Sequence, residues 1–361
     1  MARKLSLSIV LFFAITILTF SISQLSIAAS VDKNGVIHWK AQSTWIRGPG
    51  HQELADYFTE TLNHLCKGQL VIDKMYAGGE LVGAFEAIPA CSKGKLDIVS
   101  GSGFYLTGSL PWISLIIGAV ATDMKYADQL LTWQWKGGGL ELYQEYVDTK
   151  YNLKVFPYVV TPAQVIYSTK PITKKEDFKG LKIRTTGSVN MEFYKSLGAQ
   201  AVTMPMSEII PSLERKVVDA AKFALPYTDY PVRIHEIAPY ALSGVLDMPV
   251  TISMEMWING DSWKALPDDL KEKVEYAVKL SQFWSIYHLG WKNARLWEKM
   301  LDEGLKVAKA SPELQQWMYE KGRELGEKYA AQDPFAKKIL DSQETFLRTY
   351  NKYYGHSVFF R

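Results

Sequence analysis

The sequence has few of the residues that build metal and redox centres. Only two of its 361 residues are cysteines, Cys66 and Cys91, and none of its six histidines pairs with another histidine or a cysteine at metal-ligand spacing. We therefore expect no metal and no cofactor. Each cysteine falls near the end of a different predicted helix, which leaves open whether they form a disulfide or are two buried thiols.

The sequence also lacks the short motifs of common enzyme classes. It has no Gly-x-Ser-x-Gly nucleophile elbow, no phosphate-binding loop and no dinucleotide fingerprint. The glycines at 137–139 lie inside a helical region rather than after a strand, where a phosphate loop would be. These absences argue against any catalytic residue. An exported enzyme with an unrecognised carboxylate pair stays open as an alternative.

No segment is strongly charged. Lysine and arginine exceed aspartate and glutamate only slightly, giving a net charge of +3, and basic blocks such as residues 170–175 and 179–184 are broken by acidic or apolar side chains. No stripe is therefore available to neutralise a phosphate backbone, which argues against nucleic acid as a partner. With 47% hydrophobic and 22% charged residues, the composition indicates a globular protein long enough for two domains.

The N-terminal segment differs from the rest of the chain. Arg3 and Lys4 precede an almost wholly apolar run over residues 5–20, and Ser26-Ile27-Ala28 places small residues where a signal peptidase cleaves. This layout predicts a signal peptide over residues 1–28, cleaved near Ala28, with an uncleaved membrane anchor as the alternative. No later run is long and apolar enough to cross a bilayer, so we expect a soluble, exported mature protein.

After the signal, strand and helix patterns alternate. Strand patterns cover residues 36–43, 70–76 and 96–100, and helical patterns cover residues 52–65 and 81–92 between them. Strand, helix and glycine repeated at this spacing predict a parallel sheet covered by helices.

A second block repeats the alternation. Strand patterns lie at residues 165–169, 181–185 and 217–221, with helical patterns at 191–197 and 207–216. No low-complexity linker separates the two blocks. We therefore predict an α/β fold of two lobes, a hinge-bending clamshell whose lobes bend about strand crossings.

The predicted domain boundaries follow from these blocks. Lobe I comprises residues 29–160 plus 244–262, and lobe II comprises residues 161–243. Residues 263–361 form a long connecting helix, expected from Pro267 to about Gly304, and C-terminal helices that pack on both lobes. The inward-facing residues expected on the long helix are Val274, Val278, Leu280, Trp284, Tyr287, Trp291 and Leu296.

Five short segments then suggest a family. They are residues 180–184 (Gly-Leu-Lys-Ile-Arg), 204–208 (Met-Pro-Met-Ser-Glu), 213–214 (Leu-Glu), 218–221 (Val-Asp-Ala-Ala) and 264–267 (Lys-Ala-Leu-Pro). In this order and spacing they resemble the solute receptors of TRAP (tripartite ATP-independent periplasmic) transporters. The three glycines at 137–139, followed by Glu141 and Leu142, are similar to the branch of that family that binds 2-oxo acids. The resemblance covers nearly the whole mature chain.

The resemblance implies a carboxylate site on the second lobe. Arg184 matches the family arginine that pairs with the ligand carboxylate. An arginine suits this role because its planar guanidinium offers two parallel donors to the two carboxylate oxygens. Gln164 matches a second polar contact, and its amide suits a 2-oxo or 2-hydroxy group. Phe223 falls where the 2-oxo-acid branch has an aromatic wall. A surface arginine, a solvent-exposed glutamine and a core phenylalanine are the structural alternatives.

One position departs from the family pattern. Relatives that hold a cation beside the ligand place a carboxylate where this chain has Lys222, and the second expected carboxylate is replaced by Pro249, with Asp247 two positions away. A cation would be repelled by Lys222. We therefore expect the ammonium to take its place, contacting the ligand or pairing with Asp247; a lysine that points out of the cleft is the alternative.

The first lobe is expected to complete the pocket. Tyr105 follows the third predicted strand in a loop where relatives contribute a tyrosine, and Trp45 and Arg47 lie at the corresponding upper edge. The family's Pro-Phe-Gly stretch after this loop is absent, since residues 120–123 read Val-Ala-Thr-Asp. The ligand can therefore differ from a simple oxo acid.

The resemblance implies a two-lobed clamshell of the periplasmic-binding-protein kind (type II-like). Such a periplasmic receptor closes on a small carboxylate and delivers it to a TRAP membrane permease. A binding protein of similar fold that serves a signalling sensor is the first alternative. The aromatic-rich segment 346–360 resembles a terminal helix that crosses to a partner chain in the 2-oxo-acid branch, so we also expect a homodimer through the C-terminal helix.

Overall fold

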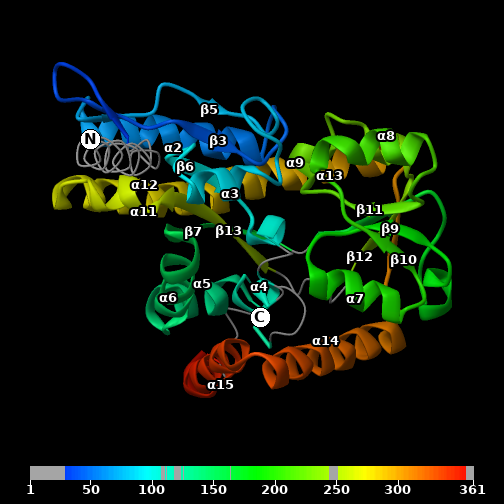
Figure 1. Ribbon diagram of the computed structural model, residues 1–361. Helices are drawn as coiled ribbons and strands as arrows, with labels where there is room; N and C mark the ends of the chain where they lie inside the picture. Colours follow the sequence, from blue (N-terminus) through cyan, green and yellow to red (C-terminus); the bar gives the residue numbers. More distant parts are fainter. Residues whose placement is uncertain are drawn as a thin grey trace, which may run out of the picture.

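The chain forms two main sheets with covering helices, as seen in the computed structural model (Figure 1). The predicted signal peptide over residues 1–28, including Ala28, lies outside the described residues, as does Asp247. The structure describes residues 29–106, 110, 112–117, 123–124, 126–162, 164–243 and 251–354.

The first sheet combines the first block with one later strand. β5, β3 and β6 run parallel, as predicted, whereas β13 is antiparallel to both β6 and β7. Helices α2 (His51–Cys66) and α3 (Ala87–Ser92) connect the parallel strands and pack on them. The strand order is β5 (Met75–Tyr76), β3 (Ala41–Ser43), β6 (Ile98–Gly101), β13 (Thr251–Asn259) and β7 (Leu153–Pro162).

Two strands predicted in the first block are each divided between sheets. The run 36–43 forms β2 (Ile37–His38) and then β3, and the run 70–76 forms β4 (Leu70–Val71) and then β5. β2 and β4 belong to a small sheet with β1 (Ser30–Val31), whereas β3 and β5 belong to the first sheet. The alternating pattern predicted both runs as strand because both halves pair, but it carries no sign of the change of sheet.

The second sheet contains the second block. β10, β9 and β11 are parallel, and β8 is antiparallel to β11 and β12. Helices α7 (Ser188–Ser196) and α8 (Ile209–Glu214) connect the parallel strands. The strand order is β10 (Gln200–Val202), β9 (Lys182–Arg184), β11 (Ala220–Lys222), β8 (Ile166–Ser168), β12 (Tyr240–Ser243) and β14 (Lys306–Lys309).

A long helix runs across both halves of the molecule (Figure 1). It consists of α12 (Asp268–Trp284), a π-helical turn over Ser285–Leu289 and α13 (Gly290–Asp302). α12 packs on α2 and β7 of the first half, and α13 packs on α9 (Pro226–Asp229) of the second. The predicted connecting helix is confirmed.

The predicted inward face of this helix is partly wrong. Val274 and Val278 are buried, but Leu280, Tyr287 and Trp291 are exposed by 45%, 53% and 65%. Ser281 and Ser285 take inward positions instead, and their hydroxyls donate to the helix carbonyls of Ala277 and Gln282. Because such back-bonded serines are satisfied inside an apolar face, hydropathy alone assigned the face incorrectly.

The end of the long helix corrects a second expectation. Residues 263–361 were predicted to be helical, but β14 follows α13 and pairs in parallel with β12. Gly304, with φ 100°, lies between them. A left-handed residue there ends the helix and turns the chain into the sheet, and only glycine adopts that conformation without strain.

The C-terminal helices close the lower side of the molecule in Figure 1. α14 (Pro312–Gln332) packs on α7 and α15, and α15 (Pro334–Tyr354) packs on α5 (Ala127–Lys136) and α6 (Gly139–Tyr151) of its own chain. α5 and α6 are separated at Gly137 and Gly138. A Cβ on Gly137 would lie 2.7 Å from the ring of Phe346 in α15, so this glycine permits the close packing.

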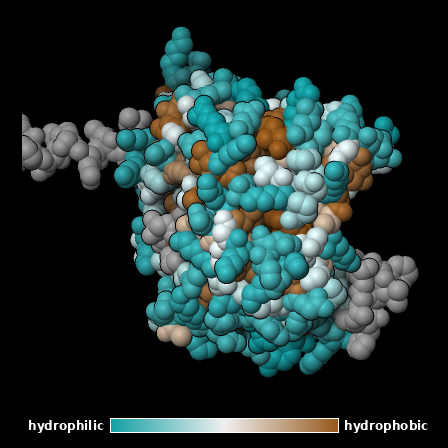
Figure 2. Space-filling model, turned by 90° about the vertical axis from the view of Figure 1, so that its right-hand side faces the viewer, coloured by the Kyte–Doolittle hydropathy of each residue, from teal (hydrophilic) through white to brown (hydrophobic). Residues whose placement is uncertain are grey.

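The surface of the second-sheet end is mainly hydrophilic, with smaller hydrophobic patches (Figure 2). In the part of the chain that the structure describes, no helix combines the length and hydropathy required to cross a membrane. Cys66 and Cys91 are both buried and unpaired with each other, which resolves the question left open by the sequence.

Candidate functional site

A small cavity lies where the two main sheets face each other. It has a volume of about 40 Å³, little more than the roughly 30 Å³ that one water molecule occupies in the liquid. All of the residues around it are at most 9% exposed. Those from the first half are Trp45, His51, Ser102, Phe104, Tyr105 and Met254, and those from the second half are Gln164, Arg184, Thr186, Met206 and Phe223.

Arg184 supplies the charge in this cavity. It ends β9 and is 4% exposed. Its Nε and Nη2 donate to the carbonyl oxygen of Met204 at 3.2 and 2.9 Å, and its Nη1 donates to the carbonyl oxygen of Lys222 at 2.7 Å. No carboxylate of the described residues forms an ion pair with it. The carbonyls and the Tyr105 phenol beside the guanidinium are neutral, so among the described residues this buried charge has no counterion, which is unfavourable unless an anion joins it.

Arg184 also keeps donors available. A guanidinium carries five N–H groups, and the three hydrogen bonds to carbonyls use one on each nitrogen. Beyond these three bonds one N–H remains on each terminal nitrogen, with the Tyr105 phenol near enough to hydrogen-bond the guanidinium. A carboxylate can engage two such N–H groups with its two oxygens. Burial lowers the pKa of Arg184 and the neighbouring Tyr105 phenol acts against this shift, but a guanidinium stays protonated in proteins.

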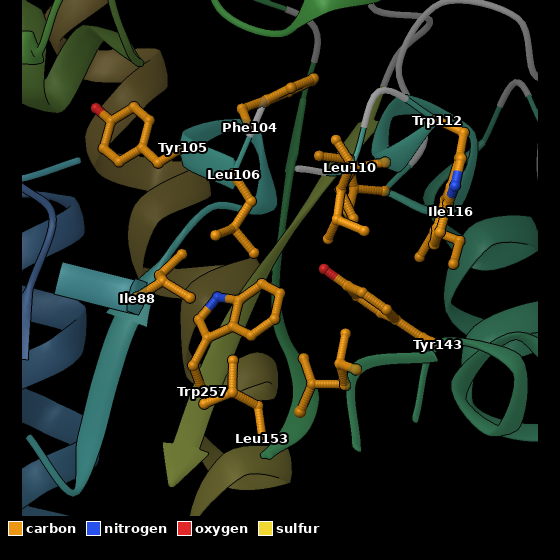
Figure 3. Close-up of a cluster of buried hydrophobic side chains, with 14 of the residues drawn as sticks. Ile88, Phe104, Tyr105, Leu106, Leu110, Trp112, Ile116, Tyr143, Leu153 and Trp257 are labelled. Atoms are coloured by element: carbon orange, nitrogen blue, oxygen red, sulfur yellow. The ribbon is translucent and has the colours of Figure 1, made fainter. Parts of the chain in front are cut away.

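Tyr105 approaches Arg184 from the other half of the molecule. It lies in the 3₁₀ turn η1 (Gly103–Leu106), directly after β6. Burial raises the pKa of the Tyr105 phenol, and the Arg184 guanidinium acts in the opposite direction, which indicates that the two groups are close. Figure 3 shows Phe104 and Tyr105 extending in different directions from this turn. The ring of Tyr105 packs edge-on against Phe85 at 4.7 Å between centroids.

A hydrogen bond from β13 holds the turn that carries these aromatic residues. The fully buried Glu255 of β13 accepts a hydrogen bond from the backbone N–H of Gly103 at 2.7 Å. Burial raises the pKa of the Glu255 carboxyl well above its ordinary range. A Cβ on Gly103 would lie 2.6 Å from Ile113 and 2.9 Å from the hydroxyl of Tyr143, so only glycine fits there.

His51 and Trp45 adjoin Tyr105 in the first-half wall. Their ring centroids are 4.9 Å apart. The indole N–H of Trp45 donates to Ser100, at 3.2 Å, whereas neither ring nitrogen of His51 has a hydrogen-bond partner. Burial lowers the pKa of His51 to about 4, so the imidazole is neutral at physiological pH.

The loop before His51 touches the second half. Gly50 has φ 88°, and a Cβ there would lie 2.1 Å from the hydroxyl oxygen of Thr228 in α9. The same hydroxyl donates to the carbonyl oxygen of Pro49 at 3.4 Å. The two halves are therefore in contact beside the cavity as well as across it.

The structure brings together five of the eight residues predicted for the site: Arg184, Gln164, Phe223, Tyr105 and Trp45 all line the cavity. Lys222 does not line it, but its buried position directly precedes Phe223 and its carbonyl oxygen binds Arg184.

The other two predicted residues are not at the cavity wall. Arg47 lies outside on an exposed edge, where its guanidinium pairs with Glu80 at 2.7 Å. Asp247 falls outside the described residues.

Sequence reasoning missed six lining residues. Phe104 and Thr186 lie within two residues of predicted residues, and Met206 lies inside one of the recognised segments. Their closeness in sequence to these positions could have identified them. His51 directly follows Gly48-Pro49-Gly50 at a helix start, which is a usable signal for a residue at a strand-to-helix connection. Ser102 and Met254 carry no signal that separates them from ordinary strand residues.

The cavity wall is poor in ligands for a metal cation. None of the described residues that line it is aspartate or glutamate, whereas protein-bound calcium takes six to eight oxygens that include carboxylates. Arg184 and the adjacent Lys222 add positive charge instead. The described donor set does not suit a resident cation.

A separate cluster of metal-ligand types lies at the surface of the second half. His235, Glu236 and Glu303 have ligand atoms within 4.8 Å of one another. However, Glu236 is paired with Arg233 at 2.6 Å, and Glu303 accepts a hydrogen bond from Tyr230. Its acids are already satisfied, so we assign no function to this cluster.

Comparisons with known proteins show which family the chain matches. The family described as bacterial extracellular solute-binding protein, family 7, matches residues 43–333. The monocarboxylate 2-oxoacid-binding periplasmic protein of Nostoc sp. is 25% identical over 315 residues, which are 86% of this chain and 84% of that protein.

Solved structures of similar fold include two TRAP solute-binding proteins. One, from Bordetella bronchiseptica, is a mixed-occupancy dimer with calcium and picolinate in its active site; it has a TM-score of 0.84 at 23% identity and covers 89% of this chain and 95% of its own. The other, from Colwellia psychrerythraea, contains calcium and pyruvate; it has a TM-score of 0.81 at 23% identity and covers 89% of this chain and 97% of its own. Both share the two-lobed fold.

Proposed function

Because the chain belongs to the bacterial extracellular solute-binding proteins of family 7, we propose that it captures a small 2-oxo or 2-hydroxy carboxylate for a TRAP membrane permease. Members of this family are periplasmic solute receptors rather than enzymes. The observation that carries the choice of ligand is Arg184, a buried guanidinium without a described carboxylate partner. The relative from Nostoc, which is named for binding monocarboxylate 2-oxo acids, supports the same ligand class.

The ligand carboxylate binds the two remaining N–H groups of Arg184. Charge assistance makes such hydrogen bonds roughly twice as strong as neutral ones. The aromatic side chains of Phe223, Tyr105 and Trp45 exclude water around this pair, which strengthens the attraction because the local dielectric is low. The amide of Gln164 binds the 2-oxo or 2-hydroxy oxygen. Arg47 has no part in this proposal, since Glu80 already neutralises it at an exposed position.

Binding requires the lobes to move. A cavity of about 40 Å³, lined by residues that are at most 9% exposed, is too small for a carboxylate of several heavy atoms, so the ligand enters a more open form. Lobe I (residues 29–160 plus 244–262) and lobe II (residues 161–243) hinge where β7 and β13 leave the first sheet. Closure then places Tyr105 against the Arg184-bound ligand.

Lys222 replaces a bound cation in this receptor. The Bordetella and Colwellia proteins contain calcium, whereas the described cavity wall here has no carboxylate and Lys222 is buried beside it. Its ammonium contacts the ligand or pairs with Asp247. Lys222→Glu should weaken pyruvate binding in the absence of metal and make binding depend on added calcium or sodium. An unchanged metal-free affinity would exclude this role.

Calorimetric titration with pyruvate, lactate and acetate tests the main proposal. Arg184→Gln should abolish measurable binding of all carboxylates, and Arg184→Lys, which keeps the charge but loses the paired donors, should weaken binding by about 10- to 100-fold. Arg233→Ala is the matched control, because Arg233 is an exposed arginine of the same lobe paired with Glu236. Carboxylate binding that survives Arg184→Gln in a folded variant would refute the assignment.

The same purification can identify the natural ligand. Mass spectrometry of small molecules released from protein that was purified without denaturation should detect an organic acid. Sequencing the N-terminus of protein from the periplasmic fraction tests removal of residues 1–28 near Ala28, since an intact Met1 would exclude cleavage.

The homodimer through the C-terminal helix is also part of the proposal. α15 packs on α5 and α6 of its own chain, and the same contacts are available to the α15 of a second copy if the connection after Gln332 extends, as in domain swapping. Sedimentation of the full mature chain should give twice the monomer mass. A monomeric mass at high concentration would remove the dimer from the proposal.

A further inference from the structure

His51 is a buried polar residue that the ligand site described above leaves unused. It is 2% exposed and lines the cavity. Neither Nδ1 nor Nε2 has a hydrogen-bond partner. Most buried polar side-chain atoms in proteins are hydrogen-bonded, and each exception requires a physical explanation, such as a missing ligand.

The described neighbours of His51 do not hydrogen-bond to its ring nitrogens. The ring of Trp45 packs against that of His51 at a tilt of 32°, but its indole N–H already donates to Ser100. The two other hydrophilic groups of the first-half wall, Ser102 and Tyr105, line the same cavity without bonding to it. The unpartnered imidazole therefore borders the space in which a ligand is enclosed.

His51 and Arg184 reach the cavity from different halves of the molecule. His51 begins α2 on the first half, and Arg184 ends β9 on the second half. A ligand held by its carboxylate at Arg184 thus presents its remaining atoms toward the first-half wall. The neutral imidazole has one N–H donor and one acceptor nitrogen, a combination that suits an oxo group or a hydroxyl group.

We infer that His51 is a specificity-determining residue that hydrogen-bonds the oxo or hydroxyl group of the ligand and thereby selects substituted carboxylates over plain ones. The inference rests on the proposed function. On this inference the oxo or hydroxyl group is recognised by the first lobe as well as by Gln164. The receptor therefore discriminates between substituted and plain carboxylates only when the lobes close.

Three probes separate this role from a general contribution to the pocket. Pyruvate has a 2-oxo group, lactate has a 2-hydroxyl group, and propionate has neither at the same chain length. His51→Phe keeps an aromatic ring against Trp45 and removes both nitrogens. We expect this variant to bind pyruvate and lactate about 10-fold more weakly, the effect of losing one buried hydrogen bond, and to bind propionate within about twofold of the wild type.

Two further variants control the result. His51→Gln places an amide N–H near the position of Nε2 and should recover part of the pyruvate affinity. His64→Phe makes the same replacement at an exposed site of the same helix and should change nothing. Melting curves without ligand establish that each variant is folded.

The outcomes are distinct. If the wild type binds none of the three carboxylates, the proposed function fails and this inference falls with it. If the wild type binds them and His51→Phe weakens all three equally, His51 acts through the carboxylate or the pocket shape and the inference is overturned. Unchanged pyruvate and lactate affinities in a folded His51→Phe variant overturn it as well.

Discussion

Closure of the lobes can be tested at a single glycine. Gly187 precedes α7 on the second half and has φ 86° and ψ 140°, a conformation that only glycine adopts without strain. A Cβ there would lie 2.7 and 2.9 Å from two ring carbons of Phe104 on the first half. Phe104 is 4% exposed and belongs to the first-half core, so its ring has little room to move. Gly187→Ala therefore opposes the closed form in particular.

The two effects of this substitution have different magnitudes and targets. Backbone strain costs about 1–3 kcal/mol and destabilises open and closed forms alike. The clash with Phe104 adds an overpacking cost, of which about 1–2 kcal/mol in the closed form would lower the apparent ligand affinity by roughly 5- to 30-fold. Gly180→Ala is the matched control, since Gly180 also has a positive φ, of 73°, but a Cβ there meets nothing within 4 Å.

Thermal melting and pyruvate titration of both variants separate strain from closure. Both should lose thermal stability without ligand, but only Gly187→Ala should bind pyruvate more weakly. Phe104→Leu, which shortens the opposing side chain, should restore part of the affinity in the double variant without restoring its melting temperature. Equal affinities for Gly187→Ala and Gly180→Ala would show that binding does not require this contact, and the closure argument would fail.

Three further predictions concern buried titratable groups. Burial raises the folded-state pKa of Asp229 to about 7, so the free energy of unfolding should fall as pH rises from about 4 to 7. Asp229→Asn, which still accepts a hydrogen bond from Tyr167, should raise the melting temperature more at pH 8 than at pH 4. Burial lowers the pKa of His51 to about 4, so stability should fall as pH decreases from 6.5 to 4, and His51→Phe should flatten that slope. Burial raises the pKa of the Cys66 thiol to about 11 and that of Cys91 well above its usual value; alkylation at pH 8 should label neither before unfolding.

Hydrophobic periodicity located most elements because one face of each packs on a sheet. α2 begins and ends within one residue of the predicted range 52–65. Periodicity failed where satisfaction of polar groups, rather than hydropathy, decided the packing. Ser281 and Ser285 are buried on the long helix because their hydroxyls donate to carbonyls of the same helix. The strand β14 was not predicted because its exposed, lysine-flanked sequence lies at the edge of the second sheet.

The cavity-lining residues were most predictable where a strand end fixed the position of the side chain. Arg184 ends β9 and Tyr105 closely follows β6, so the sheet determines where both point. Arg47 lies in the loop after β3, and the loop carries it away from the cavity to Glu80. His51 was not predicted. The glycine–proline–glycine run before it marks the start of a helix, but it does not tell whether the histidine side chain faces a cavity or solvent.

The contrast between the two arginines explains how one site can retain an anion. Arg47 and Arg184 carry the same charge, but Arg47 is neutralised by a carboxylate of its own chain at 2.7 Å, whereas Arg184 is oriented by the carbonyls of Met204 and Lys222. Carbonyl dipoles hold the guanidinium in place and leave its net charge intact. Desolvation of that charge was already incurred on folding, so an incoming carboxylate loses only its own hydration and gains a partner in a low dielectric. A binding site built with an internal carboxylate would have to break an ion pair before it could accept its ligand.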